Sequence, residues 1–511
     1  MNRRQLLGLC GGALAGSSLI GSFAQTPQGS EKGAGRTMPG TKPSRKTTEP
    51  IRGKGPNILM IMSDQHRADW MGCAGAEWVR TPNLDSLAAR GVRFTNAVCN
   101  SPVCAPSRAA LASGLRCSDV GVLGNNDLYP YNVPTYYQAL RLAGYRVGCV
   151  GKTDLHKRDH WEGRNGDRPL MYHLGFTDPT ETEGKQSAAR DWGEPVCPYQ
   201  HYLTDNGLFE TFVEDYRERG RHPACYAADS ALPLHAFHDD FIGRIAAEFL
   251  ENVSDESPWH YFVSFVGPHN PWDPPKEYGD MYRGAAMPQA IRDPMDGKPR
   301  FHRKRQEKES RGLTPEALAE TMRKYSGMVT LNDHHIGRFV EVLERRGMLE
   351  NTVIMYCADH GEMMGDHGMF HKSVYYEASV RIPLIVCGPG ITARGDSDAL
   401  VELFDLAPTA LELAKAEPLG EMTAGSLMPL LRGETQKQRD YQLSELARSR
   451  MVFDGRYKFI ERPGDVDQLY DLAEDPKELI NLAEKDPNRV SKMREMLEDE
   501  LGPAPAGRAK G

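Results

Sequence analysis

A cysteine, an arginine and the start of a helix lie close together near residue 104. Residues 101–108 are Ser-Pro-Val-Cys-Ala-Pro-Ser-Arg, and good helix formers follow at 109–112. Pro106 suits a first helical turn, because its missing N–H would have no intrahelical partner there. Cys104 is therefore predicted to lie at a helix N-terminus, which favours an anion, and Arg108 one turn later can reach the same spot. The pattern predicts a site for a tetrahedral oxyanion; a buried thiol beside a structural helix is the alternative.

Polar side chains follow four predicted strands at the points where the strands end. The apolar runs 57–62, 145–150, 259–266 and 353–358 are typical of parallel strands that are covered on both faces. The side chains that follow these runs are Asp64, Gln65, Lys152, Asp154, His156, His269, Asp359 and His360. Open α/β sheets bind ligands at the carboxyl ends of their strands, so these side chains are expected to meet.

The acids among these side chains predict a metal site. Asp64, Gln65 and Asp359 offer oxygen ligands and His360 offers one imidazole. Oxygen-rich ligand sets suit a hard divalent cation, Ca²⁺ first, with Mg²⁺ and Mn²⁺ as alternatives. Only one metal's worth of ligands is visible in the sequence, which counts against a two-metal phosphatase.

Cys104-Ala105-Pro106-Ser107-Arg108 resembles the C-x-P-S-R signature of the type I sulfatases, the formylglycine-dependent branch of the alkaline phosphatase superfamily. The likeness extends over about residues 57–482. It implies an α/β fold, with a large mixed, mostly parallel sheet sandwiched by helices and a small C-terminal antiparallel α+β subdomain. It also implies an arylsulfatase-like sulfuric ester hydrolase that acts on a small-molecule or carbohydrate sulfate ester. A maturation enzyme would convert the cysteine to formylglycine.

The resemblance also implies roles for single residues. The metal ligands would be Asp64, Gln65, Cys104, Asp359 and His360, and the catalytic residues Cys104, Arg108, Lys152, His156, His269 and Lys372. The chain departs from the family pattern at two places. Gln65 replaces the commoner second aspartate, and the usual Gly-Lys-x-His has Asp154 at its last position, with His156 two residues later. Either His156 or Asp154 would then act as the base that helps to release sulfate.

Two other functions compete with sulfate ester hydrolysis. The Asp-Gln and Asp-His pairs also occur in phosphonate monoester and phosphodiester hydrolases of the same superfamily, so they do not separate that branch from the sulfatases. A non-catalytic, exported binding protein in which Cys104 stays a thiol is the third hypothesis, and the set of ligands for a cation counts against it.

The first 52 residues predict export. Arg3 and Arg4 precede an uncharged apolar stretch and a small-residue cleavage site, which is typical of a bacterial twin-arginine signal over residues 1–24. This stretch is too short for a stable membrane anchor. A flexible linker is expected at 25–52, a catalytic domain at 53–396 and a C-terminal subdomain at 397–511, with a periplasmic or extracellular location.

Composition narrows the possible classes of protein. The chain has 511 residues and a formal net charge of −8, and the absence of a basic stripe argues against a nucleic-acid partner. Nine cysteines remain after the signal, an odd number that flags one special thiol. Cys149, Cys357 and Cys387 lie in apolar runs and are predicted to be buried free thiols. We expect pocket-forming insertions at 158–258 and a solvated basic loop at 297–311.

Overall fold

The computed structural model describes residues 53, 55–157 and 161–504, so the predicted signal and linker lie outside the described residues. Its main sheet has eight strands, parallel from β5 to β7 and mixed beyond. In order across the sheet they are β5 (Asp178–Glu181), β4 (Arg146–Gly151), β6 (Trp259–Pro268), β1 (Asn57–Asp64), β7 (Thr352–Ala358), β8 (Leu384–Cys387), β2 (Val92–Phe94) and β9 (Gly395–Ser397). The predicted mixed, mostly parallel sheet is confirmed.

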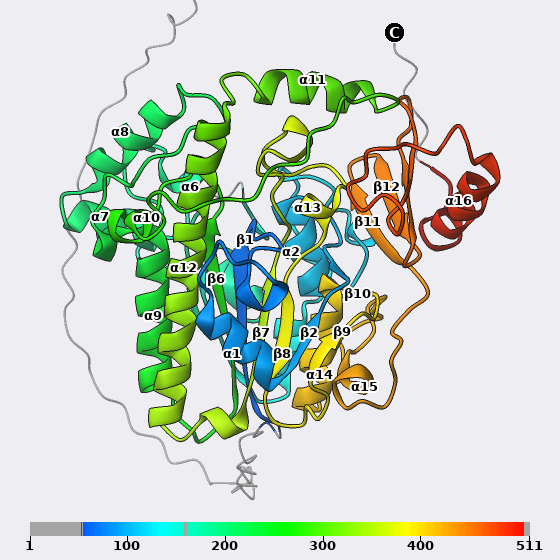
Figure 1. The fold of residues 1–511 in the computed structure, drawn as a ribbon. Coiled ribbons are helices and arrows are strands. Elements are labelled where there is room, and N and C mark those ends of the chain that lie inside the picture. The colour runs from blue at the N-terminus through cyan, green and yellow to red at the C-terminus, as the bar shows by residue number, and fades with distance from the viewer. Residues whose placement is uncertain (1–52, 54, 158–160, 505–511) are drawn as a thin grey trace, which may run out of the picture. The chain divides into compact units, whose positions relative to one another are not determined.

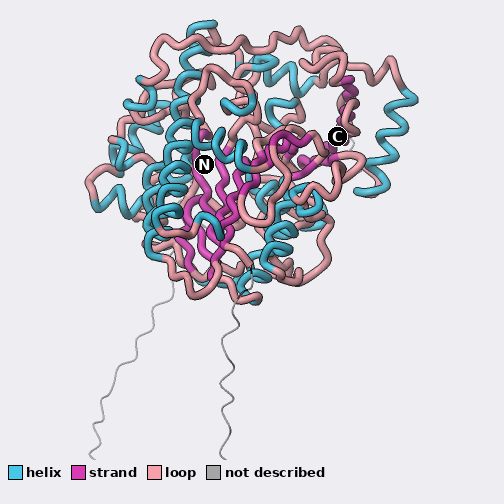
Figure 2. Tube along the Cα trace, turned by 60° about the horizontal axis from the view of Figure 1, so that its bottom comes forward, coloured by secondary structure: helices cyan, strands magenta, loops and turns pink. Residues whose placement is uncertain are grey.

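The central strand β1 buries both of its faces. Ile58, Met60 and Met62 pack into the core under one layer of helices, and Leu59 and Ile61 pack into the core under the other. The first layer contains α2 (Cys104–Ser113), α4 (Tyr136–Leu142) and α14 (Leu406–Ala414). The second contains α1 (Pro82–Arg90), α9 (His238–Asn252) and α12 (Pro315–Arg345). Figure 1 shows α9 and α12 running along one side of the sheet, and Figure 2 shows helices on both sides of the strands.

The segments between the strands contain more helix than the sequence indicates. The predicted insertion 158–258 carries α5 (Pro169–His173), α6 (Lys185–Ala188), α7 (Pro198–Asp205) and α8 (Phe209–Arg219) as well as α9. In α12, Asp333 is buried and accepts a 2.8 Å hydrogen bond from the Leu84 N–H, so it caps the start of α1. Asp333 therefore has a packing role between α12 and α1.

The prediction of a solvated loop at 297–311 is wrong. Helix α11 (Arg300–Glu309) lies there, along the top of the molecule in Figure 1. The basic sequence hides an inward face, because His302, Arg305 and Gln306 lie at i, i+3 and i+4 on one side. His302 is buried, and Gln306 donates to the His367 carbonyl over 2.9 Å.

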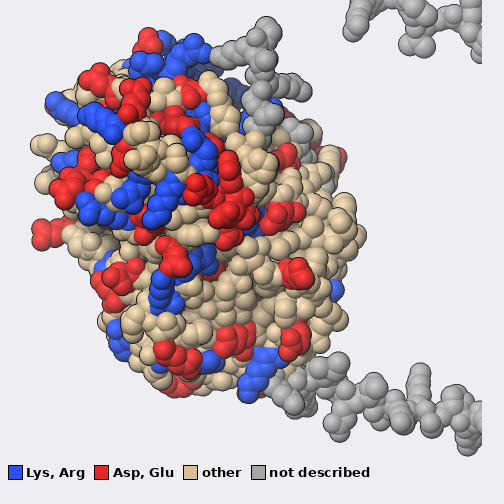
Figure 3. Space-filling view, turned by 90° about the vertical axis from the view of Figure 1, so that its right-hand side faces the viewer, with Lys and Arg blue, Asp and Glu red and all other residues tan. Residues whose placement is uncertain are grey.

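The C-terminal part forms a small antiparallel sheet, as predicted. Its strands are β11 (Gln442–Leu446), β12 (Ser449–Phe453), β13 (Tyr457–Glu461) and β14 (Gln468–Asp471), and α16 (Pro487–Leu501) covers them. Strands β12 and β13 form a hairpin with Asp454-Gly455 in the turn between them. Strand β9 straddles the domain boundary expected near 397, which stays a prediction. The face toward this end carries acidic and basic side chains intermixed (Figure 3).

Short elements complete the described chain. They are β3 (Ala97–Val98), β10 (Val401–Glu402), α3 (Cys117–Val120), α10 (Lys276–Asp280), α13 (Glu377–Val380) and α15 (Met428–Leu431), with 3₁₀ turns at Gly72–Ala74, Leu234–Ala236, Leu349–Asn351, Asp366–Gly368 and Leu403–Asp405. All nine cysteines of the described residues are free thiols, and Cys149, Cys357 and Cys387 are buried, as predicted. Within the described residues, every helix falls short of the length and apolar character that a bilayer crossing needs.

Candidate active site

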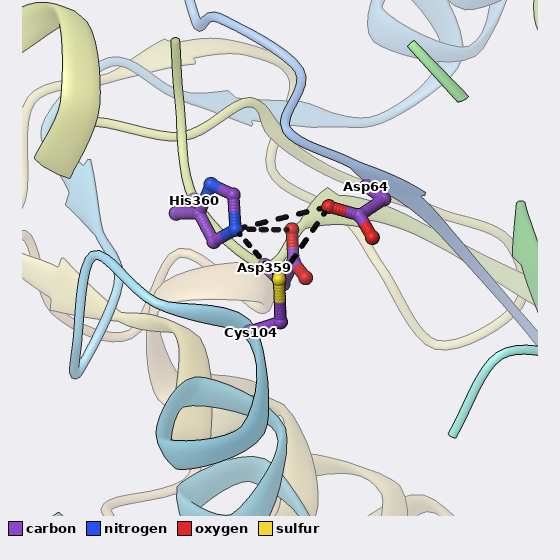
Figure 4. A group of neighbouring side chains, drawn as sticks. All are labelled: Asp64, Cys104, Asp359 and His360. Atoms are coloured by element: carbon purple, nitrogen blue, oxygen red, sulfur yellow. Dashed lines mark hydrogen bonds and ion pairs between the residues drawn. The ribbon is translucent and has the colours of Figure 1, made fainter. Parts of the chain in front are cut away.

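The carboxyl ends of four parallel strands bring the predicted residues together. Asp64 ends β1 and Lys152 follows β4, while His269 follows β6 and Asp359 follows β7. Because β1 lies between β6 and β7, its last residue is flanked by both neighbouring loops. Asp64, Cys104, Asp359 and His360 each offer one ligand atom, and these atoms all lie within 4.8 Å of one another (Figure 4).

Cys104 is fully buried at the first turn of α2. Its Sγ lies 3.1 Å from Lys372 Nζ, 3.2 Å from His360 Nε2 and 3.8 Å from Asp64 Oδ1. Figure 4 shows the thiol pointing from the helix toward the three side chains at the strand ends. The thiol lies at a helix N-terminus, as predicted, but the cation in contact with it is Lys372, whereas the Arg108 guanidinium contacts the carboxylates of Asp359 and Asp64.

Opposing effects set the acidity of the Cys104 thiol. Burial and the Asp64 carboxylate raise its pKa, but nearby cations, Lys152 first and Lys372 next, outweigh them and lower it to about 6. The other buried thiols have few such cations nearby; burial raises the pKa of Cys99, for example, well above the ordinary range. Position 104 is thus electrostatically suited to negative charge.

Arg108 links α2 to the strand ends. Its Nε donates to Asp359 Oδ2 over 2.8 Å, and one of its terminal nitrogens donates to the Lys152 carbonyl over 2.5 Å and to Ser264 Oγ over 2.8 Å. The other terminal nitrogen lies 3.7 Å from Asp64 Oδ2. Burial disfavours the charge, but Asp359 and Asp64 outweigh it and raise the pKa of Arg108. Arg108 therefore fixes the helix and both carboxylates relative to one another.

The ligand atoms have the character that a bound cation needs. His360 Nδ1 lies 3.0 Å from the Gly361 carbonyl, which only accepts, so Nδ1 carries the proton and Nε2 presents a lone pair toward Asp64 and Asp359. The Oε1 atom of Gln65 is buried and accepts no hydrogen bond from the described residues. The carboxylates of Asp64 and Asp359, the His360 lone pair and the unpaired Gln65 amide oxygen together fit a divalent cation.

Glu362 explains how glutamine works at position 65, and the sequence analysis gave it no role. Gln65 Nε2 donates to Glu362 Oε2 over 2.5 Å and to Asn270 Oδ1 over 3.4 Å, which turns the amide oxygen away from both. Glu362 is itself held by the backbone N–H groups of Met364 and His371. If the oxygen of a glutamine amide faces a cation, its NH₂ group needs an acceptor elsewhere in the chain. That requirement could have pointed to an acidic side chain such as Glu362 from the sequence.

The two candidate bases after β4, Asp154 and His156, make different contacts. Lys152 Nζ pairs with Asp64 and lies 3.1 Å from Asp154 Oδ2. Burial raises the pKa of Asp154, but Lys152, Lys157 and Arg108 outweigh it and hold it well below its usual range. His156 is buried too, and its ring packs against Tyr131, with centroids 5.1 Å apart. Asp154 thus contacts the Lys152 ammonium, whereas His156 contacts the Tyr131 ring.

His269 lies in the same electrostatic cluster. Burial, followed by the charge of Lys372, lowers its pKa well below the ordinary value, against an opposing effect of Asp64. Its Nδ1 lies 2.6 Å from the Asn270 carbonyl, so Nδ1 carries the proton and a neutral ring presents a lone pair at Nε2. His269 therefore presents a neutral imidazole to the site.

Lys372 lies in a loop that α11 holds in place. The flanking residues His371 and Ser373 have φ angles of 65° and 74°, in the left-handed region that non-glycine residues rarely adopt. Arg305 donates to the carbonyls of Phe370 and Lys372, and Glu309 accepts a 2.8 Å hydrogen bond from the Phe370 N–H. Arg305 and Glu309 also pair with each other over 2.9 Å. We call these two residues the α11 clamp. The prediction of a solvated loop at 297–311 gave neither of them a role.

A cavity of about 830 Å³ opens beside these loops. Asn270 and His371, the neighbours of His269 and Lys372, line one wall, and α8 and the segment around Trp192 line others. Of the insertion residues expected to form a pocket, Trp192 lies in this lining, whereas Tyr199 is fully buried in the core. Arg164 forms a surface ion pair with Asp205 instead.

Comparison with known proteins identifies relatives over most of the chain. A sequence model of the family described as Sulfatase matches residues 56–416, and one described as N-sulphoglucosamine sulphohydrolase, C-terminal, matches residues 365–504. An arylsulfatase of Clostridium perfringens (strain 13 / Type A) is 31% identical over 476 residues, covering 87% of this chain and 94% of that protein. An N-acetylglucosamine-6-O-sulfatase of Bacteroides thetaiotaomicron is 27% identical, covering 87% and 85%.

Solved structures show the same architecture. The crystal structure of the phosphonate monoester hydrolase of Agrobacterium radiobacter superposes with a TM-score of 0.73 at 25% identity, covering 87% of this chain and 95% of that one. The resemblance deduced from Cys104 to Arg108 is thereby confirmed. The chain belongs to the sulfatase family of the alkaline phosphatase superfamily, and it is a sulfatase.

Proposed function

We propose that the protein releases sulfate from sulfated carbohydrates by means of a formylglycine derived from Cys104 and one divalent cation. The observation that carries this proposal is the placement of Cys104, whose buried Sγ lies 3.1 Å from Lys372 Nζ and among three side chains that suit a metal. The similarity to an N-acetylglucosamine-6-O-sulfatase and the large cavity beside the site support a carbohydrate as the leaving group.

Asp64, Gln65, Asp359 and His360 would hold the cation, with position 104 completing the set. Their oxygen-rich character favours Ca²⁺, with Mg²⁺ and Mn²⁺ as alternatives. A bound cation would withdraw negative charge from the sulfate oxygens.

The protein's own side chains supply charge, position and protons. A hydrated aldehyde at position 104 would offer one hydroxyl to attack sulfur and a second to expel sulfate afterwards. Lys152 and Lys372 face the negative charge that builds on the sulfate oxygens. We assign the proton for the leaving oxygen to Lys372 rather than to His269, because neutral His269 presents a lone pair. The second hydroxyl loses its proton to His156 or to Asp154.

The mass of the peptide that carries Cys104 tests the nucleophile directly. The protein is made in a host that can modify the cysteine, and Cys104→Ala serves as the inactive control. We expect the S–H group to be replaced by a carbonyl oxygen and an aryl sulfate to be hydrolysed. An intact thiol in such a host would remove the proposed nucleophile and favour a binding protein.

Phosphonate monoester hydrolysis is the second candidate function. The similarity to the Agrobacterium radiobacter enzyme favours it, and the Gln65 and His360 ligand pattern does not separate the two chemistries. Sulfate and phosphonate monoesters with the same leaving group decide the matter by their kcat/KM ratio. A higher value for the sulfate ester supports our proposal, and a higher value for the phosphonate reverses it.

The N-terminal predictions extend the proposal. We expect cleavage after residue 24, a linker at 25–52, a catalytic domain at 53–396 and a subdomain at 397–511, and action in the periplasm or outside the cell. A maturation enzyme that forms formylglycine is the implied partner. Replacing Arg3 and Arg4 by lysine is expected to leave the protein in the cytoplasm, as cell fractionation would show.

A further inference from the structure

The loops that carry His269 and Lys372 form part of the wall of the cavity beside the active site. Asn270 lines it and accepts a hydrogen bond from Gln65 Nε2, 3.4 Å away. His371 lines it as well, next to Lys372, whose Nζ lies 3.1 Å from Cys104 Sγ. An ester whose sulfur lay beside position 104 would have this cavity next to it, available for its leaving group.

Aromatic rings form part of the cavity wall. Trp272 and His371 are stacked, at 14° with centroids 6.0 Å apart, and His222 and Tyr226 are stacked, at 11° with centroids 3.9 Å apart. The Trp192 ring lies under the Arg190 guanidinium, whose central carbon is 5.9 Å from the ring centroid. Flat rings in a large, partly open pocket suit the C–H face of a sugar.

The charge of the wall is positive and only partly compensated. Arg190 and Arg217 are exposed in the lining, and within the part of the chain that the structure describes neither forms an ion pair. Arg219 differs, because it pairs with Asp215 over 3.0 Å and donates to backbone carbonyls. The carboxylate of Asp191 accepts from the Gly193 N–H over 2.9 Å and is occupied by its own turn.

We propose that this cavity binds the leaving group of the sulfate ester and that Arg190 and Arg217 pair with a second anionic substituent on it, a sulfate or a carboxylate. This inference rests on the proposed sulfate ester hydrolysis. Two guanidinium groups at a site that already binds one anion select against neutral leaving groups and repel cationic ones. Guanidinium forks match the geometry of both kinds of oxyanion.

The test compares kcat/KM for five substrates: 4-nitrophenyl sulfate, a hexosamine 6-sulfate, its N-sulfated derivative, a monosulfated disaccharide with a uronic acid, and choline sulfate. The wild type, Arg190→Gln, Arg217→Gln and the double variant are measured. Arg221→Gln is the matched control, because Arg221 is exposed nearby, lies outside the lining and pairs with Glu218 over 2.5 Å.

We expect the ratio of kcat/KM for a doubly anionic sugar to that for 4-nitrophenyl sulfate to fall about 5- to 10-fold for each single variant and roughly 30-fold for the double variant. The ratio of kcat/KM for choline sulfate to that for 4-nitrophenyl sulfate is expected to rise in the double variant. Arg221→Gln is expected to leave both ratios unchanged. A response to the N-sulfated sugar alone identifies sulfate as the partner, and a response to the uronic acid alone identifies carboxylate.

Unchanged ratios in the double variant would overturn the inference while leaving sulfate ester hydrolysis intact. So would an equal loss in Arg221→Gln. Failure of the wild type to hydrolyse 4-nitrophenyl sulfate or any of the sugar sulfates would instead refute the proposed function itself.

Discussion

Replacing Arg305 by methionine removes the cationic half of the α11 clamp while keeping a long side chain in place. Two carbonyls of the Lys372 loop, those of Phe370 and Lys372, then lose their donors, and Glu309 loses its cation. Each hydrogen bond to a charged group contributes about 1.5–3 kcal/mol. The Arg305 side chain is 11% exposed, so water replaces part of this, and we take about 3 kcal/mol for both bonds together.

That loss acts on a loop that is strained at two positions. His371 and Ser373 have positive φ angles, each of which costs about 1–3 kcal/mol, so the loop relaxes when the clamp is gone. A shift of about 3 kcal/mol changes the equilibrium constant between the active and the relaxed loop roughly 100-fold, which lowers the active population by about that factor where the two states start near balance. We therefore expect kcat on an aryl sulfate to fall about 30- to 100-fold.

A double-mutant cycle with Lys372→Met shows whether Arg305 acts through Lys372. If it does, the variant Arg305→Met/Lys372→Met has the same kcat as Lys372→Met alone. The matched control is Arg303→Met, an exposed arginine on the same helix. Losses that multiply in the cycle, or an equal loss in the control, would refute the positioning role. Thermal unfolding of each variant separates a local effect from a general loss of stability.

Three further predictions follow from other contacts. The variant Gln65→Glu sets a carboxylate against Glu362, so the gain in Tm on adding Ca²⁺ should shrink; Glu362→Gln in the same chain should restore most of it, and two simply additive losses would contradict their pairing. Burial raises the pKa of Glu402, but Arg116 and Arg439 outweigh it and lower the value below the roughly 4.3 of an unfolded glutamate. Its stabilisation is therefore complete above that pH and lost as the pH falls through the lower folded value, so the Tm difference between wild type and Glu402→Gln should narrow below about pH 4; a constant difference would contradict this. Removing divalent cations with a chelator should abolish sulfate release and lower Tm, and added Ca²⁺ should restore both, whereas an unaffected enzyme would argue against the metal site.

The strands and their ends were predictable because local sequence encodes them. Continuous apolar runs that stop at polar residues predict buried parallel strands, and parallel strands present those residues at one edge. Asp64, Lys152 and Asp359 meet for this reason. The helix at Cys104 follows from Pro106 and the alanines after it.

Side-chain contacts made across long separations were not predictable. Helix α11 has a sequence dominated by charge, and only its contacts with carbonyls 65 and 67 residues later show that Arg305 points inward. The orientation of the Gln65 amide likewise depends on Glu362, 297 residues further along. Neither separation leaves a periodic signal, because tertiary contacts rather than local propensity decide which face of a charged helix is covered.

The burial of Cys104 also sets a time limit on its chemistry. The thiol is covered by His360 and Lys372, which follow it by 256 and 268 residues. At a synthesis rate of about 5–20 residues per second, Lys372 is made roughly 10 to 50 s after Cys104. Until then the newly made chain cannot close over the thiol. If Cys104 is converted to formylglycine as proposed, the converting enzyme has this interval, at the least, in which the thiol is accessible, so slower translation between the two residues should raise the fraction of converted protein.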